Sequence, residues 1–84
     1  MTVLYFAFVK EKRGLGEEEI ALPPSVKTLG ELVAHLKSLS PAHARALDET
    51  HLRAAVNQAI ATPQTPVGDH DEVAFFPPMT GGAS

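Results

Sequence analysis

Two strongly apolar segments, one near each end of this chain, limit the folds that it can adopt. Val3–Val9 and Glu72–Phe76 are rich in β-branched and aromatic residues, so each predicts a β-strand. Val3–Val9 is apolar on both faces, which is typical of a strand in the centre of a sheet rather than at its edge. A chain of 84 residues has room for one hydrophobic core. We therefore expect both segments in the same sheet.

The first half of the intervening sequence predicts a turn, a strand and a helix. A charged turn is expected over residues 10–16, and a weaker strand over Glu18–Leu22 would pair with the first strand as an antiparallel hairpin. Leu29–Leu39 carries leucine and valine at helical spacing. Thr28 and Glu31 form a capping-box pattern at the start of this helix.

The second half predicts shorter elements. Ser40-Pro41 ends the main helix and can cap a short helical turn over Ala42–Leu47. Leu52–Val56 has the period of two that is typical of a strand. Ala59–Ala61 continues as a strand after a turn at Asn57-Gln58.

This order of elements predicts an α+β domain of two layers, in which one main helix packs on one face of a mixed sheet. If the first and last strands lie side by side and parallel in the centre, the arrangement is a β-grasp, the ubiquitin-like fold. We assign residues 1–76 to this domain and residues 77–84 to an extended C-terminal tail that carries Gly81-Gly82.

Charge and composition exclude several classes of function. Seven Lys and Arg against 10 Asp and Glu give a net charge of −3, without the basic stripe of a nucleic-acid-binding protein. No apolar run has the length of a membrane span, and no signal-peptide pattern is present. We expect a cytoplasmic protein that binds neither nucleic acid nor a membrane. Because cysteine is absent, disulfides, zinc–thiolate sites and thiol nucleophiles are excluded.

The titratable side chains form no convincing catalytic or metal-binding set. His35, His43 and His51 are spaced eight residues apart, so no pair has the three- or four-residue spacing that places two imidazoles side by side on a helix, and we interpret them as surface or helix-flank residues. Asp69–Glu72 is interpreted as a polar turn and Glu17–Glu19 as the solvated start of a strand. We expect no metal and no tightly bound cofactor.

The C-terminal segment is the part of the chain that most suggests a function. Pro77-Pro78 cannot extend a ladder of strand hydrogen bonds and holds the chain extended. Gly81-Gly82 has no side chains, so its backbone can enter a narrow channel and approach a partner's reactive centre. This geometry suits a carrier that presents its own α-carboxyl group to other enzymes.

The run from Asp71 to Gly82, Asp-Glu-Val-Ala-Phe-Phe-Pro-Pro-Met-Thr-Gly-Gly, resembles the C-terminal signature of the small, sulfur-carrying subunits of molybdopterin synthase, the MoaD family. Ala55–Gln58 resembles that family's internal strand and Val3–Ala7 its opening strand. The likeness covers essentially the whole chain, in order and at the expected length. It implies a ubiquitin-like β-grasp.

The resemblance also implies a reaction cycle and its partners. An E1-like activating enzyme would use ATP to adenylate the carboxylate of Gly82, and a sulfur donor protein would convert the mixed anhydride into a thiocarboxylate. The chain would form a heterotetramer with the large synthase subunit, insert its tail there and donate sulfur to a cyclic pyranopterin precursor. Gly81 and Gly82 would be the catalytic positions, and no catalytic side chain is expected. A carrier without cysteine must hold its sulfur elsewhere, and the C-terminal carboxyl is available.

Alternation along the strands predicts a partner surface on the sheet face that the main helix leaves uncovered. Phe6 and Phe76 fall on that face, with Ile60 at its margin, and an exposed apolar patch of this kind usually marks an interface. Contacts with the large subunit are expected from this patch and from the first part of the tail: Phe6, Ile60, Phe76, Pro77, Pro78, Met79 and Thr80.

Ala83-Ser84 departs from the family pattern, which ends at the second glycine. These residues are either an artificial extension or part of a precursor that is trimmed. Three other functions stay open at this point. They are a β-grasp sulfur carrier for another pathway, such as thiazole synthesis, a ubiquitin-like modifier attached to lysines through the same glycine, and an interaction module without tail chemistry.

Overall fold

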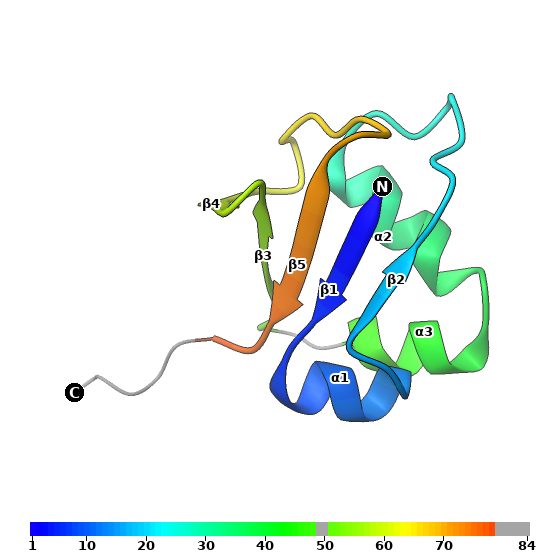
Figure 1. The fold of residues 1–84 in the computed structure, drawn as a ribbon, viewed down its shortest axis with the longest axis vertical. Helices are drawn as coiled ribbons and strands as arrows, with labels where there is room; N and C mark the ends of the chain where they lie inside the picture. The colour runs from blue at the N-terminus through cyan, green and yellow to red at the C-terminus, as the bar shows by residue number, and fades with distance from the viewer. Residues whose placement is uncertain (49–50, 79–84) are drawn as a thin grey trace.

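A five-stranded mixed sheet organises the structure, a computed structural model that describes residues 1–48 and 51–78 (Figure 1). The strand order is β2-β1-β5-β3-β4. β1 and β5 are parallel neighbours in the centre, and every other pair is antiparallel. This central parallel pair confirms the β-grasp that the sequence predicts. The strands are β1 (Thr2–Tyr5), β2 (Glu17–Glu19), β3 (Arg53–Val56), β4 (Ala59–Ile60) and β5 (Glu72–Phe76).

The described residues form three helices: α1 (Ala7–Arg13), α2 (Leu29–Lys37) and α3 (Pro41–Leu47). Figure 1 shows α2 behind the sheet and α1 at its lower end, next to α3. The predicted capping box of α2 is present, because the Glu31 backbone N–H donates to Thr28 Oγ1 at 3.3 Å and Glu31 Oε1 accepts from the Thr28 N–H at 3.2 Å. Ser40 caps α3, as predicted. None of these helices has the length and apolar character needed to span a membrane.

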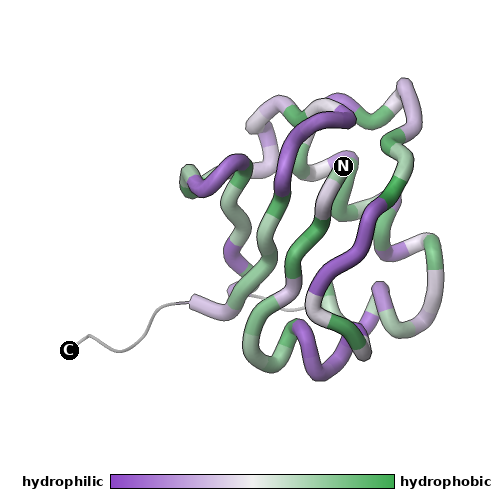
Figure 2. Tube along the Cα trace, in the orientation of Figure 1, coloured by the Kyte–Doolittle hydropathy of each residue, from purple (hydrophilic) through white to green (hydrophobic). Residues whose placement is uncertain are grey.

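The hydrophobic core lies between the two layers. Val3 and Tyr5 of β1, with Val73 and Phe75 of β5, point toward the helices and are almost completely buried. The Tyr5 and Phe75 rings stack with their centroids 6.2 Å apart. Figure 2 shows apolar colouring along most of these central strands and polar colouring along β2. Each fully buried large side chain stabilises the fold by about 1.5–3 kcal/mol, so these four are a main source of stability.

The first strand is shorter than predicted, and this prediction was wrong beyond Tyr5. The last ladder bonds run from the Tyr5 N–H to Gly16 O and from the Phe6 N–H to Phe75 O. Beyond them the neighbouring strand gives way to Pro77-Pro78, whose prolines offer no N–H to a further ladder. The chain therefore leaves the sheet at Ala7, which has a positive φ of 55°.

Helix α1 occupies the place of the predicted strand end and turn. Its Val9 is fully buried in the core, so the apolar run is satisfied by helix packing instead of strand pairing. Gly14 ends the helix with φ 94° and donates its N–H to Lys10 O. Basic residues in the last turn complement the negative end of the helix dipole. β2 is also shorter than predicted, but Ile20 and Leu22 still pack against the core.

Candidate functional site

The second face of the sheet is the first part of the candidate site, because no helix of the described residues packs on it. Val3 and Tyr5 point into the core, so their neighbour Leu4 points to the opposite face. Leu4 pairs with Ala74, Ala74 with Ala55, and Ala55 with Ile60, and residues directly opposite share a face. We call this surface the open face. It carries Leu4, Ala55, Ile60, Ala74 and Phe76, with Phe6 at its lower end.

Large apolar groups on the open face are partly exposed. Phe6 is 47% exposed and Ile60 is 73% exposed, while Phe76 is half-buried. The alanines between them place only methyl groups on the floor of the face. The two phenylalanine rings, the alanine methyl groups and the Ile60 side chain therefore expose apolar area that a partner protein can cover.

The tail begins beside this apolar surface. Phe76 is the last residue of β5, and Pro77 and Pro78 follow it. Figure 1 shows residues 77 and 78 leaving the sheet away from the helices. The structure thus brings the predicted patch residues Phe6 and Phe76 together at the root of the tail, with Ile60 farther along the same face. The predicted tail residues Met79, Thr80, Gly81 and Gly82, and the extension Ala83-Ser84, lie outside the described residues.

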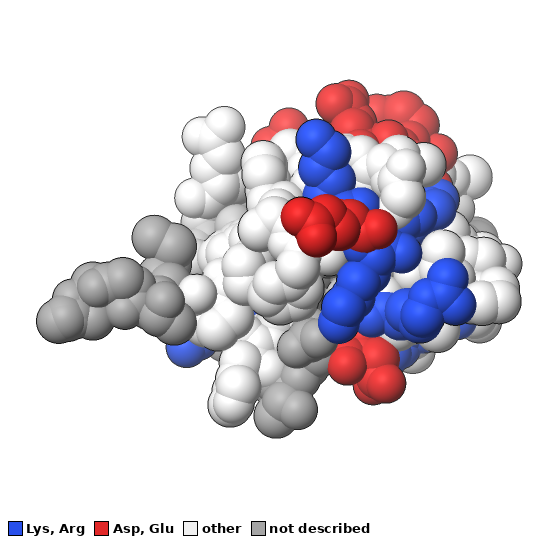
Figure 3. Space-filling model, turned by 90° about the horizontal axis from the view of Figure 1, so that it is seen from below, with Lys and Arg blue, Asp and Glu red and all other residues white. Residues whose placement is uncertain are grey.

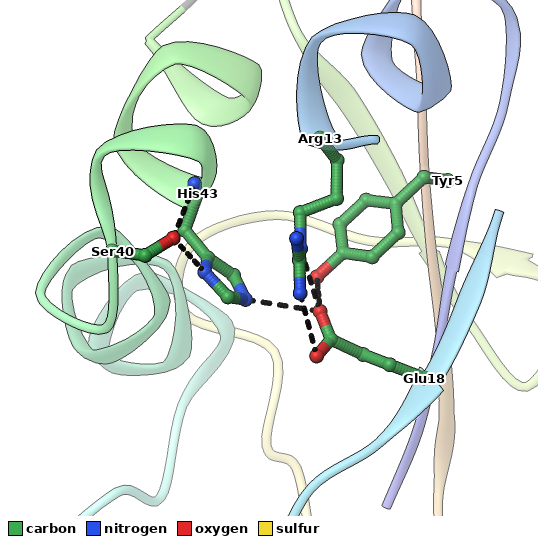
Figure 4. A network of polar contacts seen from close by, with 5 residues as sticks. All are labelled: Tyr5, Arg13, Glu18, Ser40 and His43. Carbon is green, nitrogen blue, oxygen red and sulfur yellow. Dashed lines mark hydrogen bonds and ion pairs between the residues drawn. The ribbon is translucent and has the colours of Figure 1, made fainter. Parts of the chain in front are cut away.

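A buried polar network that the sequence interpretation missed lies on the other side of the sheet (Figure 4). Glu18 Oε1 accepts hydrogen bonds from the Tyr5 hydroxyl at 2.7 Å and from Arg13 Nε at 2.9 Å. Arg13 Nη2 binds the second carboxylate oxygen at 3.0 Å, which completes a bidentate ion pair. The network therefore connects β1, β2 and α1.

His43 extends this network to α3. Its Nε2 lies 2.9 Å from Glu18 Oε1, and because an ionised carboxylate can only accept, Nε2 is the donor. Ser40 Oγ lies 2.7 Å from Nδ1 on the other side of the ring. Only 5% of His43 is exposed, so its interpretation as a surface residue was wrong.

The charge of Glu18 is stabilised by these contacts. Burial by itself would raise the pKa of Glu18, but the hydrogen bonds that the carboxylate accepts outweigh this effect and hold the pKa at about 2, below the ordinary 4.5. Burial and the neighbouring carboxylate raise the pKa of Tyr5, so its hydroxyl remains a donor. The interpretation of Glu18 as a solvated residue was therefore wrong. A signal was present, because Glu18 alternates in phase with Ile20 and Leu22, which face the core.

The polar turn before β5 is arranged as predicted. Asp71 accepts hydrogen bonds from the Asn57 side chain at 2.9 Å and from the Gly68 N–H at 2.8 Å, and these bonds lower its pKa. Asp69 accepts the Leu22 N–H at 3.0 Å, which lowers the pKa of Asp69. These carboxylates stabilise loops at the end of the sheet that is opposite to the tail. Within the described residues, no group of His, Asp and Glu has an arrangement that could hold a metal ion.

Fold and tail together define a class of protein, a ubiquitin-like β-grasp whose chain continues past its central last strand into a proline-stiffened segment. The model of the ThiS family matches residues 3–82, and the protein belongs to this family.

Curated relatives align over almost their full length. The chain is 44% identical to the molybdopterin synthase sulfur carrier subunit of Escherichia coli strain K12, over 95% of this chain and 96% of the relative. It is 35% identical to the protein of the same name from Haemophilus influenzae, over 98% and 99% of the two chains. The corresponding Mycobacterium tuberculosis protein is 37% identical over 98% and 96%.

Solved structures share the fold. SAMP1 from Haloferax volcanii superposes with a TM-score of 0.77 at 25% identity, over 98% of each chain. A putative molybdopterin converting factor, subunit 1, from Pyrococcus furiosus has a TM-score of 0.77 at 28% identity, over 93% of this chain and 95% of the other. The fold is therefore shared with SAMP1 and with a protein described as subunit 1 of a putative molybdopterin converting factor.

Proposed function

We propose that this protein is the sulfur carrier subunit of a molybdopterin synthase. The observation that carries the proposal is the 44% identity to a protein of that name over 95% of this chain. The ThiS family model also matches the chain as far as residue 82. The protruding tail root and the apolar open face support it, because a carrier must present its terminus while another surface holds its partner.

Sulfur is carried on the α-carboxyl of Gly82 in the proposed cycle. A carboxylate oxygen attacks the α-phosphate of ATP on an E1-like activating enzyme, and pyrophosphate leaves. Hydrosulfide supplied by a donor protein attacks the acyl carbon, and AMP leaves with the electrons of the C–O bond, so the product is the thiocarboxylate. The adenylate is needed because a free carboxylate is a poor electrophile. The chain contains no cysteine that could carry the sulfur instead.

The resulting thiocarboxylate then serves the large subunit of the synthase. The open face docks on that subunit through Phe6, Ile60 and Phe76. Pro77–Thr80, the first part of the tail, contacts the entrance of the channel that receives the tail. The two glycines reach the pterin precursor, where the sulfur forms a bond to a carbon as an oxygen leaving group departs from that carbon. Water then cleaves the acyl–sulfur bond, which leaves the sulfur on the precursor and restores the carboxylate. The large subunit and the activating enzyme supply the acid–base groups, and two copies of each synthase subunit form a heterotetramer.

Two rivals use the same fold with a different acceptor. A carrier for thiazole synthesis would form the same thiocarboxylate but would not support molybdopterin formation. A ubiquitin-like modifier would form isopeptide bonds with lysines, and the small archaeal modifier protein 1 of H. volcanii shares the fold with a TM-score of 0.72 at 24% identity. The fold alone does not separate these functions, so the acceptor must be tested.

The experiment uses a chain that ends at Gly82 with the activating enzyme, ATP and a sulfur source. Intact mass of the C-terminal peptide is expected to show one carboxyl oxygen replaced by sulfur. Addition of the large subunit and the pterin precursor is expected to give molybdopterin. A thiocarboxylate without molybdopterin would favour the thiazole carrier, and lysine conjugates in cell extract without a thiocarboxylate would favour the modifier. Either result would contradict the proposal.

A further inference from the structure

The charges of the open face are distributed unevenly around its apolar centre. Leu4 pairs with Glu17, and Thr2 pairs with both Glu19 and Glu72, so these three carboxylates lie on the open face. They occupy its β2 side and the end where β5 begins. At the other end, Arg53 pairs with Phe76, the last residue before the tail. Glu19 and Glu72 therefore lie at the end of the open face away from the tail, and Arg53 lies beside the tail. Glu17 lies on the β2 side of the face, next to a hollow that Phe6 also lines.

Arg53 is available to a partner. Its side chain is exposed at the start of β3, and within residues 1–48 and 51–78 no carboxylate forms an ion pair with it. Arg13, by contrast, is engaged by Glu18 inside the protein. A guanidinium that lacks an internal partner and stands at the tail root is suited to bind a carboxylate of another molecule.

The two charged ends of the open face do not neutralise each other. Phe76 and Glu72 are separated by four residues along β5, which is about 13 Å in an extended strand. This separation exceeds the Debye length of about 8 Å at physiological ionic strength, so each end acts separately on a nearby partner.

The same end of the molecule carries further positive charge. Figure 3 views the protein from below, where α1 lies, and shows Lys and Arg side chains gathered in a band that uncharged surface separates from the tail, with acidic side chains beside the band and along the upper edge. The last turn of α1 supplies Lys10 and Lys12 to this surface. The α1 lysines are thus part of a separate basic surface, and within the described residues Arg53 is the basic residue of the sheet that pairs with Phe76 beside the tail.

We infer that Arg53 sets the orientation in which the open face docks, by pairing with a carboxylate that the tail-accepting large subunit presents beside the entrance of its channel. This inference rests on the proposed function. The apolar centre supplies contact area, but its side chains carry no charge that could fix the direction of docking along the strands. The charges remove this ambiguity, because the reversed orientation would place partner carboxylates against Glu19 and Glu72 and would direct the tail away from the channel.

The test compares charge reversals at two exposed arginines. Arg53→Glu is expected to slow association with the large subunit about tenfold at ~50 mM salt, and the difference from the unmodified chain should fall below about twofold at ~500 mM salt. Arg45→Glu is the matched control, because Arg45 is exposed on α3, in the helical layer on the other side of the sheet. It should leave the association rate within about twofold at both salt concentrations. Circular dichroism establishes that both variants are folded.

The outcomes separate this inference from the proposed function. If the unmodified chain binds the large subunit and yields molybdopterin, but Arg53→Glu associates as fast as Arg45→Glu at low salt, the inference is overturned and the proposed function stands. A loss that is equal at low and high salt would also overturn it, because lost packing would then explain the effect. If the unmodified chain does not bind the large subunit, both are wrong.

Discussion

Glu18 makes the folding free energy of this small domain depend on pH. Its pKa is about 2 in the folded protein and 4.5 without its partners, so the folded protein releases this proton more readily than the unfolded chain. The resulting stabilisation is complete above pH 4.5 and is lost as the pH falls toward 2. Because the carboxylate is only 19% exposed, we expect a loss of about 2 kcal/mol from this group.

Urea unfolding between pH 7 and pH 2.5 checks this expectation. Glu18→Gln should be less stable at neutral pH and should lose much less stability on acidification. Asp69 and Asp71 also have lowered pKa values, so part of the acid dependence will remain in that variant. Glu17→Gln is the matched control, since Glu17 is exposed on the open face and should leave both quantities nearly unchanged. Equal acid profiles for Glu18→Gln and the unmodified chain would contradict the role of Glu18.

The elements show where local sequence patterns suffice and where they fail. The capping box at Thr28 and the Ser40 cap are set by neighbouring residues, so the starts of α2 and α3 could be predicted. Helix α1 was missed because Val3–Val9 has the composition of a strand. The point at which β1 ends is set by the length of the neighbouring strands β2 and β5, which the composition of Val3–Val9 does not reveal. Lys10–Arg13 followed by Gly14 is a helix C-terminus pattern, and it was the available signal.

Gly14 allows a direct test of this helix end. Its φ of 94° is unfavourable for residues with a Cβ, whereas an added Cβ would meet nothing within 4 Å. Gly14→Ala should therefore destabilise the domain by about 1 kcal/mol through backbone strain alone. Gly68→Ala is the control, because Gly68 has no positive φ and its added Cβ would approach only Asp71 Oδ2 at 3.8 Å. Thermal unfolding gives both values, and equal stabilities of the two variants would contradict the strain argument.

At the scale of the whole molecule, the central parallel strand pair and the open face followed from the sequence, but the order of the outer strands β3 and β4 and the polar network did not. Strand hydrophobicity placed β1 and β5 in the centre, and alternation placed Phe6 and Phe76 on the open face. The network joins residues 5, 13, 18 and 43, which come together only after the helices pack. Alternation with Ile20 and Leu22 indicates that Glu18 faces the core, but a single sequence carries no local pattern that identifies its distant partners Arg13 and His43.

Two adjacent phenylalanines of β5 allow the contributions of this strand to folding and to partner binding to be measured separately. Phe75 is fully buried, so Phe75→Ala should cost about 4 kcal/mol of folding free energy and leave much of the domain unfolded. Phe76 lies on the open face, so Phe76→Ala should leave the domain folded and weaken binding to the large subunit by about 2 kcal/mol. Circular dichroism and titration calorimetry measure the two effects. Unchanged affinity in folded Phe76→Ala would remove Phe76 from the interface.

Sulfur transfer also depends on where the reactive carboxyl stands relative to the docked domain. The proposed chemistry needs a free carboxylate at Gly82, whereas the chain with Ala83-Ser84 has its free carboxylate at Ser84. Sulfur attached there would be displaced by about 7 Å along an extended chain, and a misplacement of about 1 Å can already reduce a rate a hundredfold.

We therefore expect the chain ending at Gly82 to form a thiocarboxylate and support molybdopterin synthesis. The chain with Ala83-Ser84 should bind the large subunit through the open face with equal affinity but transfer no sulfur. Intact mass and molybdopterin formation, measured on both chains side by side, check this, and sulfur transfer from Ser84 would contradict the terminal-glycine mechanism.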